Sequence, residues 1–443
     1  LVWQDGQPLT SSDVLFTYQA IQNPDARSPL QSSWQGITVT APDPRTIAFK
    51  LPGGLASFPY TMTNGIVPRH LLSKVPVADL RSADFNTVHP IGAGPFAWRA
   101  IHVTGDGDPK NAGQQIALKP FAQYQGGAPK LQEFEVQIFA NKSQLTKAFA
   151  DNQLKAIEGL NALPKELSND RSVIQNNLTL RAANMVFFKT SSGVLAEQPV
   201  RQSLVQAANV PKIIKHLGYT TRAVREPFLL GQFGYDPSLA QPGFDLRAAR
   251  ALLESNGWKL NNKGLRAKSG QALAFTLTAP STTEGRYVSY QLQKQWQALG
   301  VKLNLQFLDT VEFQSALTFH SYEAILNGIS IGIDPDVFVY WDSSQADIRS
   351  ANRLNFSEYK NPAADAALES GRTRLDPTLR LIKYRPFLEA WQRDTPALGL
   401  YQPRLLYITH GAISGLDDRP LTTPSDRFAN VHNWQIRQAR VTN

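Results

Sequence analysis

Pro90-Ile91-Gly92-Ala93-Gly94-Pro95-Phe96 marks the clearest break in the chain. Its two glycines and two prolines exclude a regular helix, because glycine readily takes positive φ values, while proline fixes φ and lacks a backbone donor. The segment therefore predicts a stiff, shaped connector between packed units. Taken alone, it is also compatible with an ordinary surface loop, since glycine and proline occur in most loops.

Three further motifs stand in a fixed order around this segment. Asp5-Gly6-Gln7-Pro8-Leu9-Thr10 precedes it, and Tyr124-Gln125-Gly126-Gly127-Ala128-Pro129 and Val200-Arg201-Gln202-Ser203-Leu204 follow it. Together the four motifs resemble the extracytoplasmic solute-binding proteins of family 5, which deliver peptides and nickel to ABC importers. In that family a P-x-G-[TA]-G-P-[FY] run marks the passage from a small subdomain into the lobe that carries the hinge.

Later motifs extend the resemblance over essentially all 443 residues. Ile66-Val67-Pro68-Arg69-His70-Leu71-Leu72 is similar to the family's G-I-x-P-x-H-x-L run. Leu252-Leu253-Glu254-Ser255-Asn256-Gly257-Trp258 is similar to L-L-x-x-A-G-W, and Leu299-Gly300-Val301-Lys302-Leu303 to L-G-I-x-V. Asn361-Pro362 belongs to a late run that resembles N-x-x-x-Y-x-N-P-x-x-D. Each motif is weak by itself, but their order and spacing together are specific.

The hydrophobic pattern of the later half indicates an α/β fold. Apolar residues alternate over 273–277 and 301–307, as in strands, whereas Val288, Leu292 and Trp296 recur at helical spacing. Alternating helices and strands favour an α/β lobe, and 443 residues are too many for one hydrophobic core. The resemblance implies a two-lobe periplasmic-binding-protein-like fold, type II, cluster C, with an additional small subdomain.

We therefore expect four segments. Residues 1–88 form a small α+β subdomain that is incomplete at its N-terminus, and residues 89–208 form the hinge-bearing lobe I. Residues 209–403 form the α/β lobe II, and residues 404–443 return to lobe I. Because the resembled family begins further upstream, we expect a signal or lipid anchor in a preceding segment.

The amino-acid composition indicates which kinds of partner the protein can bind. The net charge of +9 and pI of about 9.5 allow a nucleic-acid-binding protein, but no run of Lys and Arg exceeds two residues. We therefore expect a basic surface that faces an anionic envelope, and no nucleic-acid partner. The absence of Cys excludes disulfides, thiolate metal sites and a Cys nucleophile, and suits an exported bacterial protein.

One catalytic motif is present. Gly328-Ile329-Ser330-Ile331-Gly332 matches the G-x-S-x-G nucleophile elbow, which requires a strand, a sharp turn and then a helix. Ile333-Asp334-Pro335-Asp336 follows and is a poor helix start, so we expect no catalytic residue and no enzyme. A serine hydrolase that uses Ser330, with His410 or His432, stays as an alternative.

No metal or cofactor is expected. None of the seven His residues lies three or four positions from another, and no HExxH motif occurs. In the nickel-binding branch of the resembled family a His stands near the Asp-Pro pair after the cleft strand. The corresponding residues 334–337 contain no His.

The resemblance implies a substrate-binding component of an ABC importer, located outside the cytoplasm in the periplasm or on the outer face of the cytoplasmic membrane. We expect a monomer that captures short peptides in an interlobe cleft by hinge closure and hands them to a membrane permease. A ligand-sensing module of a regulator is the other alternative.

An extended peptide can add to an exposed strand edge through main-chain hydrogen bonds, and residues 327–332 are the candidate edge. Together with the positions carried over from the resembled family, the expected ligand-binding residues are Leu30, Trp34, Asn184, Met185, Thr310, Asn327, Gly328, Ile329, Ser330, Gly332, Asp334 and Tyr401.

The residue that would hold the peptide's amine departs from the family pattern. Peptide-binding members carry an Asp four residues after the cleft glycine, but that position is Gly332 here. Asp334 is the nearest replacement, and strand alternation would keep it on the same face as Ser330 and Gly332. The competing interpretation is that Asp334-Pro335-Asp336 is a turn with a solvated carboxylate.

Overall fold

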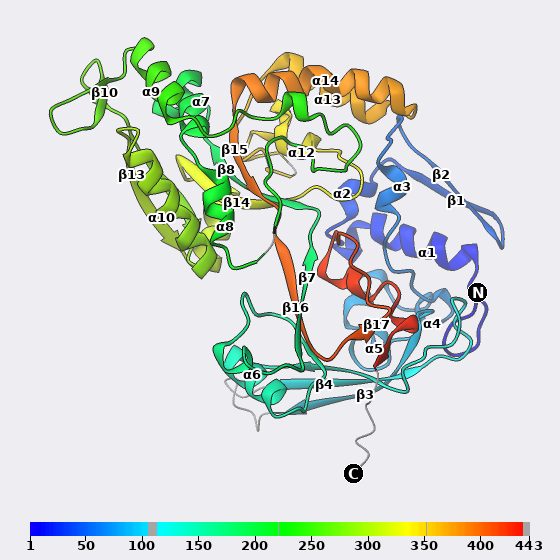
Figure 1. The fold of residues 1–443 in the computed structure, drawn as a ribbon. Coiled ribbons are helices and arrows are strands. Elements are labelled where there is room, and N and C mark those ends of the chain that lie inside the picture. Colours follow the sequence, from blue (N-terminus) through cyan, green and yellow to red (C-terminus); the bar gives the residue numbers. More distant parts are fainter. Residues whose placement is uncertain (105–112, 220, 351, 437–443) are drawn as a thin grey trace. The chain divides into compact units, whose positions relative to one another are not determined.

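The computed structural model describes residues 1–104, 113–219, 221–350 and 352–436, which form two compact units (Figure 1). The first unit comprises Leu1–Gly53, Thr63–Leu178 and Leu405–Asn443, and the second comprises Gly54–Met62 and Thr179–Arg404. The combination of helices and sheets confirms the α/β fold class that the sequence predicts. The Pro90–Phe96 segment lies inside the first unit, where the Gln4 side chain bonds to the backbone of Gly92, Gly94 and Phe96.

The unit boundaries differ from the segment boundaries expected from sequence. Residues 179–208, expected in lobe I, belong to the second unit, and so do residues 54–62 of the small subdomain. Residues 179–208 belong to the second unit because of strand pairing, as shown below, and residues 54–62 because of hydrogen bonds from both backbone and side chain. Ala56 donates its backbone N–H to Arg372 O, and Ser57 Oγ donates to Asp336.

A helix and a hairpin form the start of the first unit. Helix α1 (Ser11–Gln22) begins with the capping box of Thr10 and Asp13, as the sequence predicts. Strands β1 (Thr38–Asp43) and β2 (Thr46–Lys50) pair antiparallel beside it. The short helices of this part are α2 (Gln31–Trp34), α4 (Arg69–Leu72) and α5 (Asp84–Thr87).

Two three-stranded sheets form the rest of the first unit. Strands β3 (Phe96–Thr104), β4 (Gly113–Pro120) and β5 (Phe134–Ile138) make an antiparallel meander. The second sheet has the order β6 (Ala156–Ile157), β16 (Arg404–His410) and β7 (Val173–Thr179), and helix α6 (Lys142–Ala150) packs beside it. Strands β17 (Ile413–Ser414) and β18 (Gln435–Ile436) form a small pair.

A five-stranded sheet organises the second unit. Its order is β13 (Lys302–Leu308), β12 (Ala274–Pro280), β14 (Ala324–Ser330), β8 (Ala182–Phe188) and β15 (Ala397–Tyr401). Strand β12 pairs in parallel with β13 and β14, whereas β8 runs antiparallel to both β14 and β15. Strand β8 is therefore an interior strand of this sheet, which is why the chain from residue 179 onward belongs to the second unit.

Helices cover both faces of this sheet (Figure 1). One core contains residues of α7 (Gln198–Gln206), α8 (Val210–Lys215), α9 (Leu246–Ser255) and α10 (Thr283–Gln297). The other contains residues of α11 (Thr310–Phe319), α12 (Phe338–Trp341), α13 (Pro362–Thr373) and α14 (Pro377–Asp394). Helix α3 (Phe58–Thr61) and the small sheet of β9 (Lys259–Leu260), β10 (Arg266–Lys268) and β11 (Gln271–Ala272) complete the second unit.

Alternation along β8 separates the two cores. Val186 and Phe188 belong to the α10 core, whereas Met185 and Phe187 belong to the α11 core. All four side chains are fully buried, as expected for a strand covered on both faces. The α10 core and the α11 core are used below as names for the two sides of the sheet.

Candidate functional site

The carboxyl ends of four strands meet at one edge of the five-stranded sheet. Strands β12, β13 and β14 are parallel, and β15 runs in the same direction because both β14 and β15 are antiparallel to β8. From β12 the chain passes through α10 to β13, and it then returns through α11 to β14 on the other side of β12. Ligands of open α/β sheets bind at the carboxyl edge where the strand order reverses in this way.

Strand β14 has an open side near this edge. It pairs with β8 along its whole length, from Ala324 opposite Phe188 to Ser330 opposite Ala182. It pairs with β12 only through Ala324 and Ile325. Among the described residues, the backbone from 326 to 330 therefore has a strand on one side only, which is the region expected to be an edge.

Three predicted residues meet on the α10 side of this edge. Asn184 of β8 lies opposite both Gly328 of β14 and Tyr401 of β15. A Cβ atom on Gly328 would stand 2.8 Å from Asn184 Oδ1, so the missing side chain leaves space for the amide. The Tyr401 hydroxyl forms a hydrogen bond with the Asn184 side chain. The Asn184 side chain thus links β8 to Tyr401 of β15 and lies against Gly328 of β14.

Sequence reasoning missed Glu284, which completes this group. The Tyr401 hydroxyl donates to Glu284 Oε1 at 2.7 Å, and the Tyr219 hydroxyl donates to Oε2 at 3.2 Å. The Arg404 guanidinium stands 4.1 Å from the centre of the Tyr219 ring. We call Asn184, Tyr219, Glu284 and Tyr401 the strand-end cluster. In sequence, Thr282-Thr283-Glu284 is a normal helix start, so nothing local distinguishes Glu284.

The two tyrosines keep their protons. Burial raises the pKa of Tyr401 well above its ordinary value, and the negative charge of Glu284 raises that pKa further. The pKa of Tyr219 is raised by the same two causes in the same order. Both hydroxyls are therefore fixed as donors to the Glu284 carboxylate at any physiological pH.

Other predicted strand residues face the opposite side. Met185 and Ile329 are buried in the α11 core. Asn327 lies between Ile325 and Ile329 in the alternation of β14 and is half-buried. The predicted residues of β14 thus face two sides of the sheet. Gly328 and Ser330 lie on the side of the strand-end cluster.

The structure corrects the expected environment of Asp334. Strand β14 ends at Ser330, and Gly332 takes a φ of +78°, so strand alternation does not continue to Asp334. Its carboxylate forms two hydrogen bonds with the Arg380 guanidinium, at 2.7 and 2.6 Å. The Asp334 side chain is only 7% exposed, so the alternative of a solvated carboxylate is wrong. The negative charge of Asp334 is therefore already paired with a buried guanidinium.

Three expected residues do not belong to this cluster. Thr310 is exposed and is the first residue of α11, directly after Asp309, which forms a capping box with Glu312. Leu30 and Trp34 belong to the first unit. Leu30 is 39% exposed, whereas Trp34 is 3% exposed and packs 4.2 Å from Tyr18 between ring centres.

The nucleophile elbow is not formed. Ser330 ends a strand, but the residues after it turn at Gly332, and the next described α-helix is α12, which begins at Phe338. His410 belongs to the first unit, where it stacks on Phe149 and bonds to Phe149 O. The helix that must follow the strand and sharp turn of a nucleophile elbow is therefore missing directly after Ser330.

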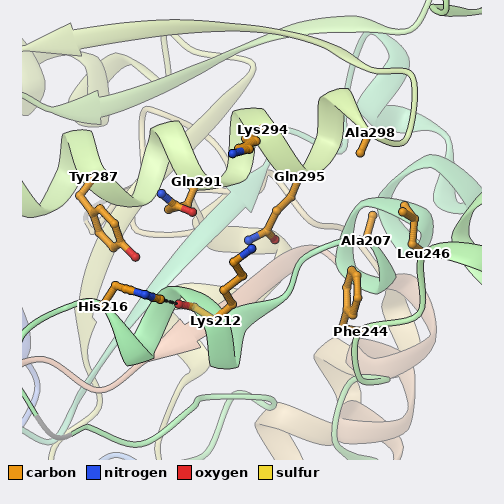
Figure 2. A pocket seen from close by; sticks show the side chains of 10 residues that line it. All are labelled: Ala207, Lys212, His216, Phe244, Leu246, Tyr287, Gln291, Lys294, Gln295 and Ala298. Carbon is orange, nitrogen blue, oxygen red and sulfur yellow. Dashed lines mark hydrogen bonds between the residues drawn. The ribbon is translucent and has the colours of Figure 1, made fainter.

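A separate hollow lies beside α8 and α10 (Figure 2). Its volume is about 390 Å³, and Lys212, Phe244 and Lys294 contribute to its wall. Two of its polar groups bond locally, because His216 Nδ1 donates to Lys212 O and the Tyr287 hydroxyl donates to Ile213 O. None of the residues predicted to bind ligand lines this hollow.

The described residues contain neither a metal-binding group of side chains nor a helix that could span a membrane. Neither His, Asp nor Glu side chains there form a group of three that could hold a metal ion. Among the helices of the described ranges, none has both the length and the apolar character to cross a membrane.

Several known proteins are similar to this chain. It is 26% identical to protein XP55 of Streptomyces lividans, covering 92% of this chain and 71% of that protein. It is 24% identical to the oligopeptide-binding protein AppA of Bacillus subtilis, covering 98% and 79%.

Solved structures share the fold. The structure of AppA from Bacillus subtilis in complex with a nonapeptide matches with a TM-score of 0.73 and 21% identity, covering 98% of this chain and 85% of that one. The structure of NikZ from Campylobacter jejuni in complex with Ni(L-His) matches with a TM-score of 0.79 and 21% identity, covering 98% and 86%. These matches confirm the expected two-lobe fold.

The profile of the bacterial extracellular solute-binding proteins, family 5 (middle), matches residues 1–350, which is most of the chain. This protein therefore belongs to the family 5 solute-binding proteins, as its sequence motifs indicate.

Proposed function

We propose that this protein is the substrate-binding component of an ABC importer and that it binds short peptides along β14. The open side of β14 from residue 326 to 330 carries this proposal. An extended peptide there gains main-chain hydrogen bonds, which do not depend on its side chains. AppA of Bacillus subtilis, a relative with the same fold, is known in complex with a nonapeptide.

Particular side chains suit this role. Gly328 has no side chain to cover the strand, and glycine in a strand often marks the close approach of another backbone. The Asn184 amide offers a donor and an acceptor beside it. Tyr401 is almost fully buried, so its hydroxyl positions Asn184 and Glu284. Leu30 and Trp34 of the first unit, and Thr310 of the second, complete the proposed ligand-binding set.

Hinge closure follows from the way in which the units are connected. The chain passes from the first unit to the second near residues 178–179 and returns near 404–405. Leu180 donates its backbone N–H to Pro403 O at 3.0 Å, so these two connections lie side by side. We propose that they flex together while the units move as rigid bodies, with the ligand between them.

The remaining parts of the proposal concern location and partners. Family 5 members are extracellular solute-binding proteins. We propose that this protein acts outside the cytoplasmic membrane as a monomer, held by an N-terminal signal or lipid anchor, and that it delivers its ligand to a membrane permease. Its proposed role involves binding alone, without catalysis or a cofactor.

Native mass spectrometry of the gently purified protein tests the peptide proposal. We expect additional mass from co-purifying peptides, which is lost on partial unfolding and restored by adding a defined peptide library. A protein that remains free of peptide in both conditions, while binding a non-peptide solute, would reject the peptide part of the proposal.

A further inference from the structure

The hollow between α8 and α10 has the size of a small-molecule site (Figure 2). Its volume is about 390 Å³, within the range of pockets that hold small organic ligands. One face of α10 lines it, because Tyr287, Gln291 and Gln295 recur at intervals of four residues. Phe244 and Leu246, at the start of α9, stand at one end. None of the residues of the strand-end cluster lines this hollow.

The hollow carries positive charge without a matching acid. Lys212 and Lys294 both line it, and no Asp or Glu is among its lining residues. Within the described ranges, neither lysine uses its side-chain nitrogen in an ion pair or a hydrogen bond. Asp245 follows Phe244 in the chain, but its carboxylate caps α9 by accepting the Ala248 N–H at 2.9 Å. The charge of the two lysines is therefore available to an anion from outside.

The Gln295 amide adds a hydrogen-bond donor that lacks an acceptor. Its Oε1 accepts the Asn209 N–H at 2.6 Å, which fixes the orientation of the amide. Its Nε2 is buried and has no hydrogen-bond partner among the described residues. Asn209 also caps α8 by accepting the Lys212 N–H, and Figure 2 shows the side chains of Lys212 and Gln295 pointing toward one another. An oxygen atom that the exposed Lys212 side chain admits between the two donors would satisfy both.

The rest of the wall is apolar. Ala207, Leu246 and Ala298 contribute to it, and Phe244 leaves 48% of its surface in water. An aromatic ring placed against Phe244 would cover that surface and gain stacked or edge-to-face contact. An inorganic anion would leave it exposed. The hollow thus suits a ligand that has a negative group and an apolar body.

We propose that this hollow is a second binding site, which takes a small aromatic carboxylate. The carboxylate accepts hydrogen bonds from Lys212 Nζ and Gln295 Nε2, and the charge of Lys294 adds to its attraction. The ring lies against Phe244. This inference does not rest on the peptide proposal, because none of the residues assigned to peptide binding lines the hollow.

The test is calorimetric titration with benzoate, phenylacetate and 2-naphthoate, which share the carboxylate and differ in the size of the apolar body. Two further probes separate the contributions of charge and ring. The compound 2-naphthamide keeps the ring without the charge, and inorganic phosphate keeps a charge without the ring.

Two variants and two matched controls locate the binding. Lys212→Met removes one charge of the hollow and keeps the length of the side chain, and Phe244→Ala removes the ring. Lys215→Met is the control for the first, because Lys215 is exposed on the same helix but does not line the hollow. Phe319→Ala is the control for the second, because Phe319 is 61% exposed at the end of α11. All four side chains are exposed, and thermal melting checks that each variant is folded.

We expect the wild type and both controls to bind at least one of the three carboxylates. In these proteins, 2-naphthamide and phosphate should bind about 10-fold more weakly or worse. Lys212→Met and Phe244→Ala should each lower the affinity for the carboxylate by about 10-fold, the scale for one charged hydrogen bond or one aromatic contact.

Four results would overturn the inference. Wild-type protein that binds none of the three carboxylates would reject the site. Equal binding of 2-naphthoate and 2-naphthamide would remove the role of the charge, and phosphate binding as tight as that of the carboxylates would remove the role of the ring. Equal affinities in Lys212→Met and Lys215→Met would place the bound acid elsewhere on the protein. Each of these outcomes leaves the peptide proposal as it stands.

Discussion

Asp334, which the sequence suggests as a ligand contact, is one partner of a buried ion pair. Its ion pair with Arg380 joins the turn after β14 to α14, and both side chains are less than 10% exposed, at 7% and 8%. A buried ion pair contributes little net stability, but removing one partner leaves an uncompensated buried charge.

Asp334→Asn should therefore lower the free energy of unfolding by about 3–5 kcal/mol. Replacing both partners with apolar residues, as Asp334→Leu with Arg380→Met, should cost clearly less, because no buried charge remains. Urea unfolding of the three proteins measures this. A single variant with wild-type stability that binds free-amine peptides more weakly would restore Asp334 as the amine contact.

Glu226 gives the second unit a pH-dependent stability. The residue is fully buried, its Oε1 has no hydrogen-bond partner among the described residues, and burial raises its pKa from 4.5 to about 7. Between pH 4.5 and about 7 the unfolded chain loses this proton while the folded chain retains it. The contribution of Glu226 to stability should therefore fall as the pH rises through that range and stay constant above it.

Above pH 7 we expect the free energy of unfolding of Glu226→Gln to exceed that of the wild type by on the order of 2–3 kcal/mol, relative to the difference between the two proteins near pH 4. Near pH 4 titration of Glu226 should contribute little to that difference. Urea unfolding of both proteins from pH 4 to 8 tests this, since other titrating groups cancel in the difference. A difference in stability that does not change with pH would mean that Glu226 titrates normally in the folded protein.

At the scale of elements, the proposed mode of peptide binding depends on β14. Gly328→Val would place a branched side chain against Asn184 and over the open backbone, where even a single Cβ stands 2.8 Å from Asn184 Oδ1. We expect peptide affinity to fall by about 10-fold or more, the effect of roughly 1.4 kcal/mol.

Ser330→Ala is the matched control on the same strand and the same side. It removes one neutral hydroxyl, so peptide affinity should change by less than about 1 kcal/mol. The same protein also tests the hydrolase alternative, because ester hydrolysis that disappears with Ser330→Ala would establish an active serine. Similar losses of affinity in both variants would show that the backbone of β14 is not the contact.

Local signals predicted many elements, whereas long-range pairing could not be predicted. Asn361 and Asp376 each cap a helix that begins with Pro, as their sequence context indicates. The assignment of β8 to the second unit depends on pairing with β14, far along the chain, for which no local pattern exists. The same limit applies to the site, since Glu284 acquires its partners from Tyr219 and Tyr401 only through folding.

At the scale of the whole molecule, ligand binding should bring the two units into a closed arrangement. We expect the radius of gyration from small-angle scattering to decrease when a bound peptide saturates the protein. Because the chain has no Cys, the variant with Lys165→Cys and Lys294→Cys carries one spin label on each unit without background labelling. An unchanged label distance and scattering profile at saturating peptide would argue against hinge closure.

The placement of β8 and β16 also determines when the protein can fold during its synthesis. Strand β8 is an interior strand that needs β15, which ends at Tyr401, and the β6–β16–β7 sheet of the first unit needs β16, which ends at His410. Both sheets thus wait for strands that lie far along the chain from their partners, and such distant pairing is slow because long loops must close first. The nascent chain consequently remains without either finished sheet until these strands have been synthesised, and an unfinished chain of this kind can still be threaded through a narrow pore.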